Sequence, residues 1–406
     1  MKKMSLLILL LFVFGLMSGV SNAATVKKAV KAKESVSKVV APVVTPIVKE
    51  AQPSQAIETS VEEDKLADYK EETNKALSAL KSQIEKVSSD NKDAKVGGVV
   101  FFRWQKYVTN GGTNVNNFGV DRAYLDFKKK LSGDANVRVT LDVRQLGSDS
   151  TKNLYYYLKY AYVELPVGIP SLLQPIPYTL TAKIGLQHTA WVDWADKMFN
   201  LRWIAKSLVD NEGVMSSSDF GLGATGKISV ANMPDIEYHG TLLNGSGYSN
   251  SESDGGKDIG LRLNSTLLQN EMVGDLVVGA WQNIHGATKS DITGTTRQGG
   301  LMAGLKNDIY TVYGEYLGGT NISGASIGGK CQVYGPLTAF ARVDNYDPDT
   351  TKANNKLDRS FYGVIYDYSK DVKFSADMQN VTGGSSASTS KGVTTSVLYL
   401  HSMIAF

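Results

Sequence analysis

Charged residues recur at every second position in several stretches of the chain, and this spacing limits the chemistry they can perform. In VRVTLDVRQL the polar set is Arg138, Thr140, Asp142 and Arg144, and apolar residues separate its members. Residues two apart share one face of a β-strand, so such a stretch presents guanidinium and carboxylate groups in one row. A row of this kind either guides ions in water or braces neighbouring strands through ion pairs.

The sequence has no comparable pattern of residues that would indicate catalysis. The four histidines, His188, His239, His285 and His401, are scattered, and no serine motif resembles a nucleophile elbow. Ser402 and His401 are adjacent, which places them on opposite faces of a strand. No ligand spacing typical of a metal site is present. We therefore expect a protein that is not an enzyme and that needs neither cofactor nor metal.

The elements that would position the charged rows are β-strands. The chain ends with SVLYLHSMIAF, an alternating segment whose terminal Phe406 is typical of the closing strand of an outer-membrane β-barrel. Upstream, predicted strands are separated in turn by short turns such as LSGD and long polar loops such as GSGYSNSESDGGK. This pattern predicts an all-β fold, a transmembrane antiparallel β-barrel over residues 97–406 with sixteen strands, 14 to 18 being compatible. Two of these strands are expected at 309–318 and 325–334. A soluble β-sandwich is the competing fold, but it leaves the apolar outward faces without a purpose.

The segment before the barrel has three parts. Residues 1–23 have two lysines, an apolar run and small residues at cleavage spacing, as in a secretory signal peptide. Residues 24–59 form a Lys-, Ala-, Val- and Pro-rich linker that we expect in the periplasm. Residues 60–90 have apolar residues at alternating steps of three and four, which predicts a helix. That helix is either a coiled coil joining copies of the protein or a lone amphipathic helix.

In a barrel, the polar face of each strand lines the lumen. Basic residues predominate on that face, which would favour anions, whereas pairing across strands would cancel the bias. The predicted pore-lining residues are Arg103, Arg122, Asp126, Lys128, Arg138, Asp142, Arg144, Lys183, Lys227, Arg262, Lys330 and Arg342, and the same alternation turns Glu237, Glu315, Asp344, Lys373 and Asp377 inward.

The third long loop is rich in aromatic residues, which are poorly placed on a solvated tip. We expect it to fold into the lumen as a constriction loop; burial at a trimer interface is the competing explanation. The constriction residues predicted on this loop are Trp191, Asp193, Trp194, Asp196, Lys197, Arg202 and Lys206, with Phe199 and Trp203 beside them.

Several segments resemble the phosphate-selective porin O and P family of Gram-negative bacteria. They include AYLDFKKKLSGDANVRVTLDV, SSDFGLGATGKIS and an R-x-I-x-x-S-L motif at Arg202, Ile204, Ser207 and Leu208, and the similarity covers residues 97–250. The resemblance implies a sixteen-stranded trimeric barrel with its third loop in the lumen. The arginine ladder and lysine cluster of that family have no residue-by-residue match here, so phosphate is one compatible substrate and not a conclusion.

Two functions are compatible with these features. The first is an outer-membrane porin for passive diffusion of small hydrophilic solutes or anions, in contact with membrane lipid and assembled as a homotrimer. The second is a structural anchor that tethers the envelope, reaching peptidoglycan through residues 24–90. Lys and Arg number 43 against 40 Asp and Glu, so there is no charge excess to indicate nucleic acid as a partner.

Overall fold

The structure, a computed structural model, describes residues 94–108, 115–145, 154–168, 178–252, 255–286, 296–383 and 394–406, with the backbone alone at 144 and 145. It also describes five residues between 75 and 82, which are helical, and the helix over residues 60–90 stays a prediction. The predicted signal peptide 1–23, the linker 24–59 and the coiled-coil seam lie outside the described residues. The chain divides into two compact units, 1–92 and 93–406, and the second contains the strands.

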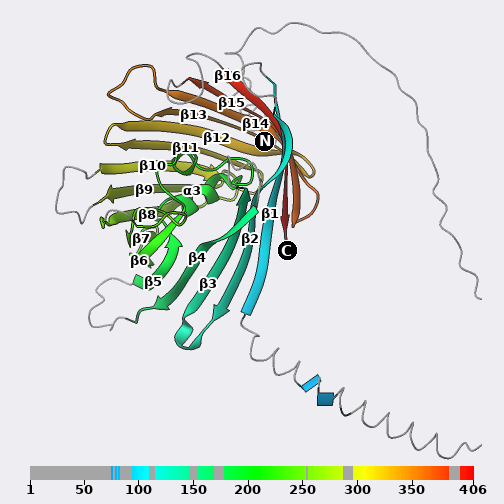
Figure 1. Cartoon of the computed structure of the whole chain (residues 1–406). Coiled ribbons are helices and arrows are strands. Elements are labelled where there is room, and N and C mark those ends of the chain that lie inside the picture. Colours follow the sequence, from blue (N-terminus) through cyan, green and yellow to red (C-terminus); the bar gives the residue numbers. More distant parts are fainter. Residues whose placement is uncertain are drawn as a thin grey trace, which may run out of the picture. The chain divides into compact units, whose positions relative to one another are not determined.

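Within the described residues, sixteen strands form one closed antiparallel barrel in sequence order, which confirms the predicted fold class and strand number (Figure 1). None of the helices that the structure describes has the length and apolarity to cross a membrane. The strands are β1 (Ala94–Tyr107), β2 (Asn116–Lys130), β3 (Asn136–Gln145), β4 (Leu154–Pro166), β5 (Tyr178–His188), β6 (Ser218–Ile228), β7 (Ile236–Leu243), β8 (Asp258–Leu268), β9 (Asp275–His285), β10 (Thr296–Lys306), β11 (Tyr310–Gly319), β12 (Ile322–Tyr334), β13 (Leu337–Asp347), β14 (Leu357–Asp367), β15 (Val372–Gly383) and β16 (Thr394–Ala405).

The two ends of the barrel sequence close it. Strand β1 pairs with β2 on one side and with β16 on the other, so no edge strand is left open. The terminal Phe406 takes part in this closure, because its backbone exchanges two hydrogen bonds of 2.9 and 3.0 Å with Gly98. A Cβ on Gly98 would lie 2.5 Å from Cζ of the Phe406 ring. Glycine at this position therefore makes room for the terminal aromatic residue.

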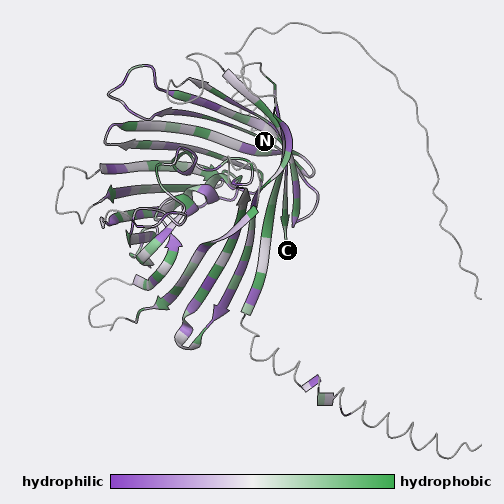
Figure 2. Ribbon diagram, viewed as in Figure 1, coloured by the Kyte–Doolittle hydropathy of each residue, from purple (hydrophilic) through white to green (hydrophobic). Residues whose placement is uncertain are grey.

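The strands alternate in polarity, with apolar side chains on the outward face. On β8, Ile259, Leu261 and Leu263 are 45, 48 and 44% exposed, whereas Asn264 on the inward face is buried. Figure 2 shows the same striping of hydrophobic and hydrophilic residues along the other strands. An exposed apolar outer wall is the surface that a barrel presents to lipid.

One connection is shorter than expected. The sequence pattern predicts a strand from residue 325, but β12 begins at Ile322, so only Thr320 and Asn321 join it to β11. Asn321 has a left-handed backbone (φ 59°), a conformation that asparagine tolerates well in tight turns. Strands β11 and β12 therefore continue through the segment that the sequence pattern assigned to a loop.

Residues 189–217, between β5 and β6, form an inserted loop that lies inside the ring of strands (Figure 1). It contains the helices α3 (Val192–Phe199) and α4 (Leu208–Asn211). Its apolar side chains form one buried cluster with inward-facing residues of the wall, among them Trp281, Tyr313 and Phe340. The main hydrophobic core of the barrel is thus the contact between the inserted loop and the wall.

Glycines on the inner wall make room for this loop. A Cβ on Gly279 would overlap the Trp194 ring, and one on Gly304 would lie 2.7 Å from the Met198 sulfur. Any larger side chain at these positions must displace the side chain of Trp194 or Met198, because interiors are packed too densely to absorb the extra atoms.

We therefore expect Gly279→Ala to destabilise the folded barrel by about 1–3 kcal/mol, the usual cost of overpacking. Thermal unfolding in detergent measures this cost. The matched control is Gly240→Ala on β7, where an added Cβ has no atom within 4 Å. If the two variants unfold at the same temperature, Trp194 does not pack against Gly279.

Candidate lumen constriction

Helix α3 gives the inserted loop its buried face. Val192, Ala195, Met198 and Phe199 are spaced so that they share one side of the helix, and all four are buried. On the opposite side, Lys197 donates a hydrogen bond of 2.6 Å to Asp193 one turn earlier. The helix ends where Asn200 adopts a left-handed conformation and its N–H bonds to the carbonyl of Asp196.

The aromatic residues of the inserted loop pack against the inner wall. Trp191 is fully buried, and its ring nitrogen donates a hydrogen bond of 2.8 Å to Glu315 on β11. It also stacks on Trp281 of β9, with ring centroids 5.8 Å apart. Trp203 is 5% exposed and lies 6.4 Å from the His401 ring of β16. These contacts within one chain account for the aromatic content of the loop without a subunit interface.

Wall side chains also bind the main chain of the inserted loop. Arg262 donates a hydrogen bond of 2.9 Å to the carbonyl of Ala190, and Gln379 donates one of 3.2 Å to Ile204. Arg342 bonds to the carbonyl of Lys206. These donors come from β8, β15 and β13, so the loop is fastened at several points around the barrel.

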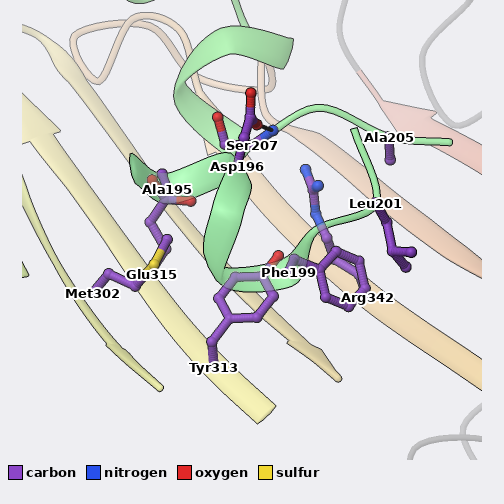
Figure 3. Close-up of a pocket in the computed structure, with 10 residues that line it drawn as sticks. All are labelled: Ala195, Asp196, Phe199, Leu201, Ala205, Ser207, Met302, Tyr313, Glu315 and Arg342. Atoms are coloured by element: carbon purple, nitrogen blue, oxygen red, sulfur yellow. Dashed lines mark hydrogen bonds between the residues drawn. The ribbon is translucent and has the colours of Figure 1, made fainter. Parts of the chain in front are cut away.

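Arg359 of β14 fastens the end of α4, since it forms two hydrogen bonds, of 2.6 and 3.2 Å, with the Glu212 carboxylate. A small cavity of about 10 Å³ remains between α3 and the wall (Figure 3). Ser207 closes one side of it, with its backbone N–H bonded to Asp196 at 2.8 Å. The cavity has room for about one water molecule, so the loop and wall are in close contact here.

Most charged groups of the inserted loop pair with one another, whereas Glu212 pairs with Arg359 of the wall. Arg202 bonds to both Asp196 and Asp210, and Lys206 lies 3.5 Å from Asp210. Burial disfavours the Asp210 carboxylate, but Arg202 and Lys206 outweigh burial and hold the pKa of Asp210 below its usual value. Burial likewise opposes ionisation of Asp193, and His188 and Lys197 hold the pKa of Asp193 low. Both carboxylates are therefore ionised at neutral pH.

The structure joins most of the predicted wall cations to carboxylates within the described residues. Asp121, Glu164 and Asp235 are partners that the alternation of polar residues did not select. The pairs are Arg103 with Asp121, Arg122 with Asp142 (2.7 Å), Arg138 with Asp126 (3.0 Å), Lys128 with Asp126 (3.7 Å), Lys183 with Glu164 (2.9 Å) and Lys227 with Asp235 (2.7 Å).

Four predicted residues have other surroundings. Arg342 is only 1% exposed and pairs with Asp344 beneath the inserted loop, so its assignment to the pore lining is wrong. It binds the loop and does not face open space. Arg262 likewise binds the loop, through its hydrogen bond to the carbonyl of Ala190. Lys330 is partly buried on β12. The side chain of Arg144 lies outside the described residues.

A hollow of about 330 Å³ remains between the inserted loop and the wall. Four cations line it, Arg103 and Arg122 from the wall and Arg202 and Lys206 from the loop. Its lining also contains Asp121. The other carboxylates that pair with these cations, Asp142, Asp196 and Asp210, are not part of the lining. The remaining lining residues are Phe101, Val120, Trp203, Ile204, Ala205, Asn211, Phe361, Gln379, Tyr399 and His401.

Two charged residues near this hollow were missed because they lie at β-bulges. The register between β1 and β2 shifts next to Asp121, and that between β3 and β4 shifts next to Lys159. A bulge puts two residues opposite one, so the alternation of faces fails there. Asp121 thereby reaches Arg103, and Lys159 is buried beside the loop residue Ser217. A break in alternation within YYYLKYAYV was the only available signal for Lys159.

The site contains no evident metal centre. Among the residues that the structure describes, no group of three or more His, Cys, Asp or Glu side chains is placed to hold a metal ion. Cys331 is a free cysteine that is buried on β12. What the arrangement offers is a polar, charged space bounded by a loop and a wall.

Comparison with known proteins identifies the fold. No protein-family model and no curated protein matches the chain. Among solved structures, OprB of Pseudomonas putida aligns with a TM-score of 0.56 at 8% identity over 79% of this chain and 96% of its own. OmpT of Vibrio cholerae aligns with a TM-score of 0.50 at 11% identity, over 77% of this chain and 97% of its own. An anion-selective porin from Comamonas acidovorans aligns with a TM-score of 0.50 at 12% identity, over 77% of this chain and 99% of its own. The chain therefore has the closed sixteen-stranded fold of bacterial outer-membrane porins; membership of the O and P family stays a prediction.

The lowered pKa of Asp210 leads to a test by pH. We expect Asp210→Asn to lower the stability of the barrel by about 1–3 kcal/mol at neutral pH, because Arg202 loses a charged partner. A carboxyl whose folded-state pKa is lowered stabilises the fold above its unfolded value, about 3.9, and this stability is lost as the pH falls through the folded value.

Melting temperatures of both proteins from pH 7 to pH 3 measure this effect. The difference should be constant down to about pH 4 and shrink below it. Asp371→Asn, in the exposed turn after β14, is the control and should change little. A difference that has already vanished at pH 5 would contradict the lowered pKa of Asp210.

Proposed function

We propose that this protein is an outer-membrane porin, a water-filled channel for passive diffusion of small hydrophilic solutes or ions, with a mild preference for anions. The observation that carries the proposal is the hollow of about 330 Å³ between loop and wall, lined by four cations. A closed barrel with an apolar outer wall supplies the passage through lipid. The inserted loop supplies the narrow part, where solutes meet charged side chains.

The anion preference follows from the exposure of the charged side chains, because the cations are more exposed than most of the carboxylates that pair with them. The side chains of Arg103 and Lys206 are 38 and 36% exposed, and that of Arg202 is 22% exposed. Asp210, which pairs with Arg202 and Lys206, is 10% exposed. Asp142, behind Arg122, is fully buried. Pairing reduces the field of each cation, but the surface that a solute meets is richer in cations, and low-dielectric walls focus their field.

Phosphate is one anion compatible with this proposal, through the resemblance of residues 97–250 to porins of the O and P type. Assembly as a homotrimer is proposed on the same resemblance and on the likeness in fold to porins. We place the barrel in the bacterial outer membrane and residues 24–90 in the periplasm. Tethering of peptidoglycan by residues 24–90 remains an untested prediction, because those residues lie almost entirely outside the described ones.

The proposal predicts that Lys206→Glu shifts selectivity toward cations. Reversing one charge about 7 Å from a passing ion is worth about 0.6 kcal/mol per ion in 0.1 M salt, so the anion-to-cation permeability ratio should fall on the order of fivefold. The reversal potential of a planar bilayer under a salt gradient measures the ratio. The shift should fade at 1 M salt, where screening shortens to about 3 Å.

The matched control is Lys370→Glu, the same charge reversal in the turn after β14, where the side chain is 89% exposed. We expect it to leave the reversal potential nearly unchanged. Equal effects of the two substitutions, or cation selectivity in the unmodified channel, would contradict the role assigned to the hollow.

A further inference from the structure

Tyr248 brings a second loop to the constriction. It lies in the connection between β7 and β8, yet its hydroxyl is 3.4 Å from Nη1 of Arg122, a hollow-lining residue on β2. Its ring stacks on Tyr157 of β4, with centroids 5.6 Å apart and planes 24° apart. The connection therefore reaches from β7 and β8 to the wall formed by β2 and β4.

Beneath Tyr248 lies the amino group of Lys159. Its nitrogen is 3.6 Å from the centroid of the Tyr248 ring, and it also bonds to Ser217. Lys159 is 1% exposed, whereas Tyr248 is partly exposed. Within the part of the chain that the structure describes, no carboxylate lies at ion-pair distance from Lys159. Unlike most of the wall cations, it is covered by an aromatic ring in place of an acid.

The second loop, the connection between β7 and β8, is held in this position by its glycine conformations and by contacts of its backbone with Asp219 and Ser216. Gly245 and Gly247 have positive φ angles of 97 and 74°, which side-chain-bearing residues rarely adopt. The N–H of Gly245 bonds to Asp219 on β6 at 2.6 Å. A Cβ on Gly247 would lie 2.9 Å from the Ser216 hydroxyl, so the second loop packs closely on the end of the inserted loop. Tyr248 is thus presented by a fixed turn.

We propose that Tyr248 is a selectivity-determining residue of the channel, because its ring covers the Lys159 amino group and keeps that group away from water and solutes in the lumen. Arg122 remains at the hollow with Asp142 as its partner, whereas the Lys159 amino group is enclosed. The strength of the anion preference is therefore limited by one aromatic side chain. This inference rests on the proposed channel function and adds a residue that acts on it through Lys159.

Three variants test the proposal by reversal potential. Tyr248→Ala exposes the Lys159 amino group to water, where a lysine is protonated at neutral pH, and the anion-to-cation permeability ratio should rise roughly two- to threefold at 0.1 M salt. Tyr248→Phe keeps the ring and loses only the hydroxyl contact with Arg122, so it should change the ratio less than Tyr248→Ala. Adding Lys159→Met to Tyr248→Ala should abolish the rise. A rise that persists in the double variant, or no difference between Ala and Phe, overturns the proposal.

A second measurement needs no substitution. A small water-soluble amine-acylating reagent applied to the folded protein should modify Lys206 readily and Lys159 far more slowly, as read by mass spectrometry of peptides. Rapid modification of Lys159 overturns the proposal even if Tyr248→Ala does not fold. An unmodified protein that does not conduct contradicts the channel function itself, and the acylation rates still decide whether Tyr248 covers Lys159.

Discussion

A loop inside a barrel must find hydrogen-bond donors for its own main chain, and this requirement organises the constriction. Buried carbonyl groups without partners are costly. Here wall side chains satisfy three of them, with Arg262 bonding to Ala190, Gln379 to Ile204 and Arg342 to Lys206. Each donor used in this way fixes the loop, and Arg342, which is 1% exposed, is also removed from the set of cations that solutes could meet. Counting inward-facing cations therefore overestimates the charge available for selectivity.

The loop and the wall complement each other in side-chain size, and both supply cations to the hollow. The wall has glycine at 279 and 304, where the loop brings Trp194 and Met198. The loop supplies Arg202 and Lys206 to the hollow, where the wall supplies Arg103 and Arg122. The buried contact holds the loop in place, so the exposed charges face each other across a space of defined size. In the proposed channel, stability and selectivity thus depend on the same segment.

The sequence predicted the barrel, its sixteen strands and the aromatic loop, because alternating polarity and turn chemistry are local signals. It failed where structure depends on pairing between strands. The bulges next to Asp121 and Lys159 change which residues face inward, and a bulge leaves no reliable trace in a single strand. Arg342 was assigned to the correct face but to the wrong role, since only the folded loop covers it. Tyr248 could not be predicted, because its partner Arg122 is 126 residues away.

We infer that the folded barrel is an open channel in which the inserted loop sets the width. Single-channel recording of the purified, folded protein in planar bilayers, with neutral polymers of graded size added to the bath, measures this width. We expect steady ohmic conductance that small polymers reduce, whereas polymers too large to pass the space between loop and wall should leave it unchanged. A folded protein that does not conduct, or a conductance reduced equally by polymers of every size, would contradict it.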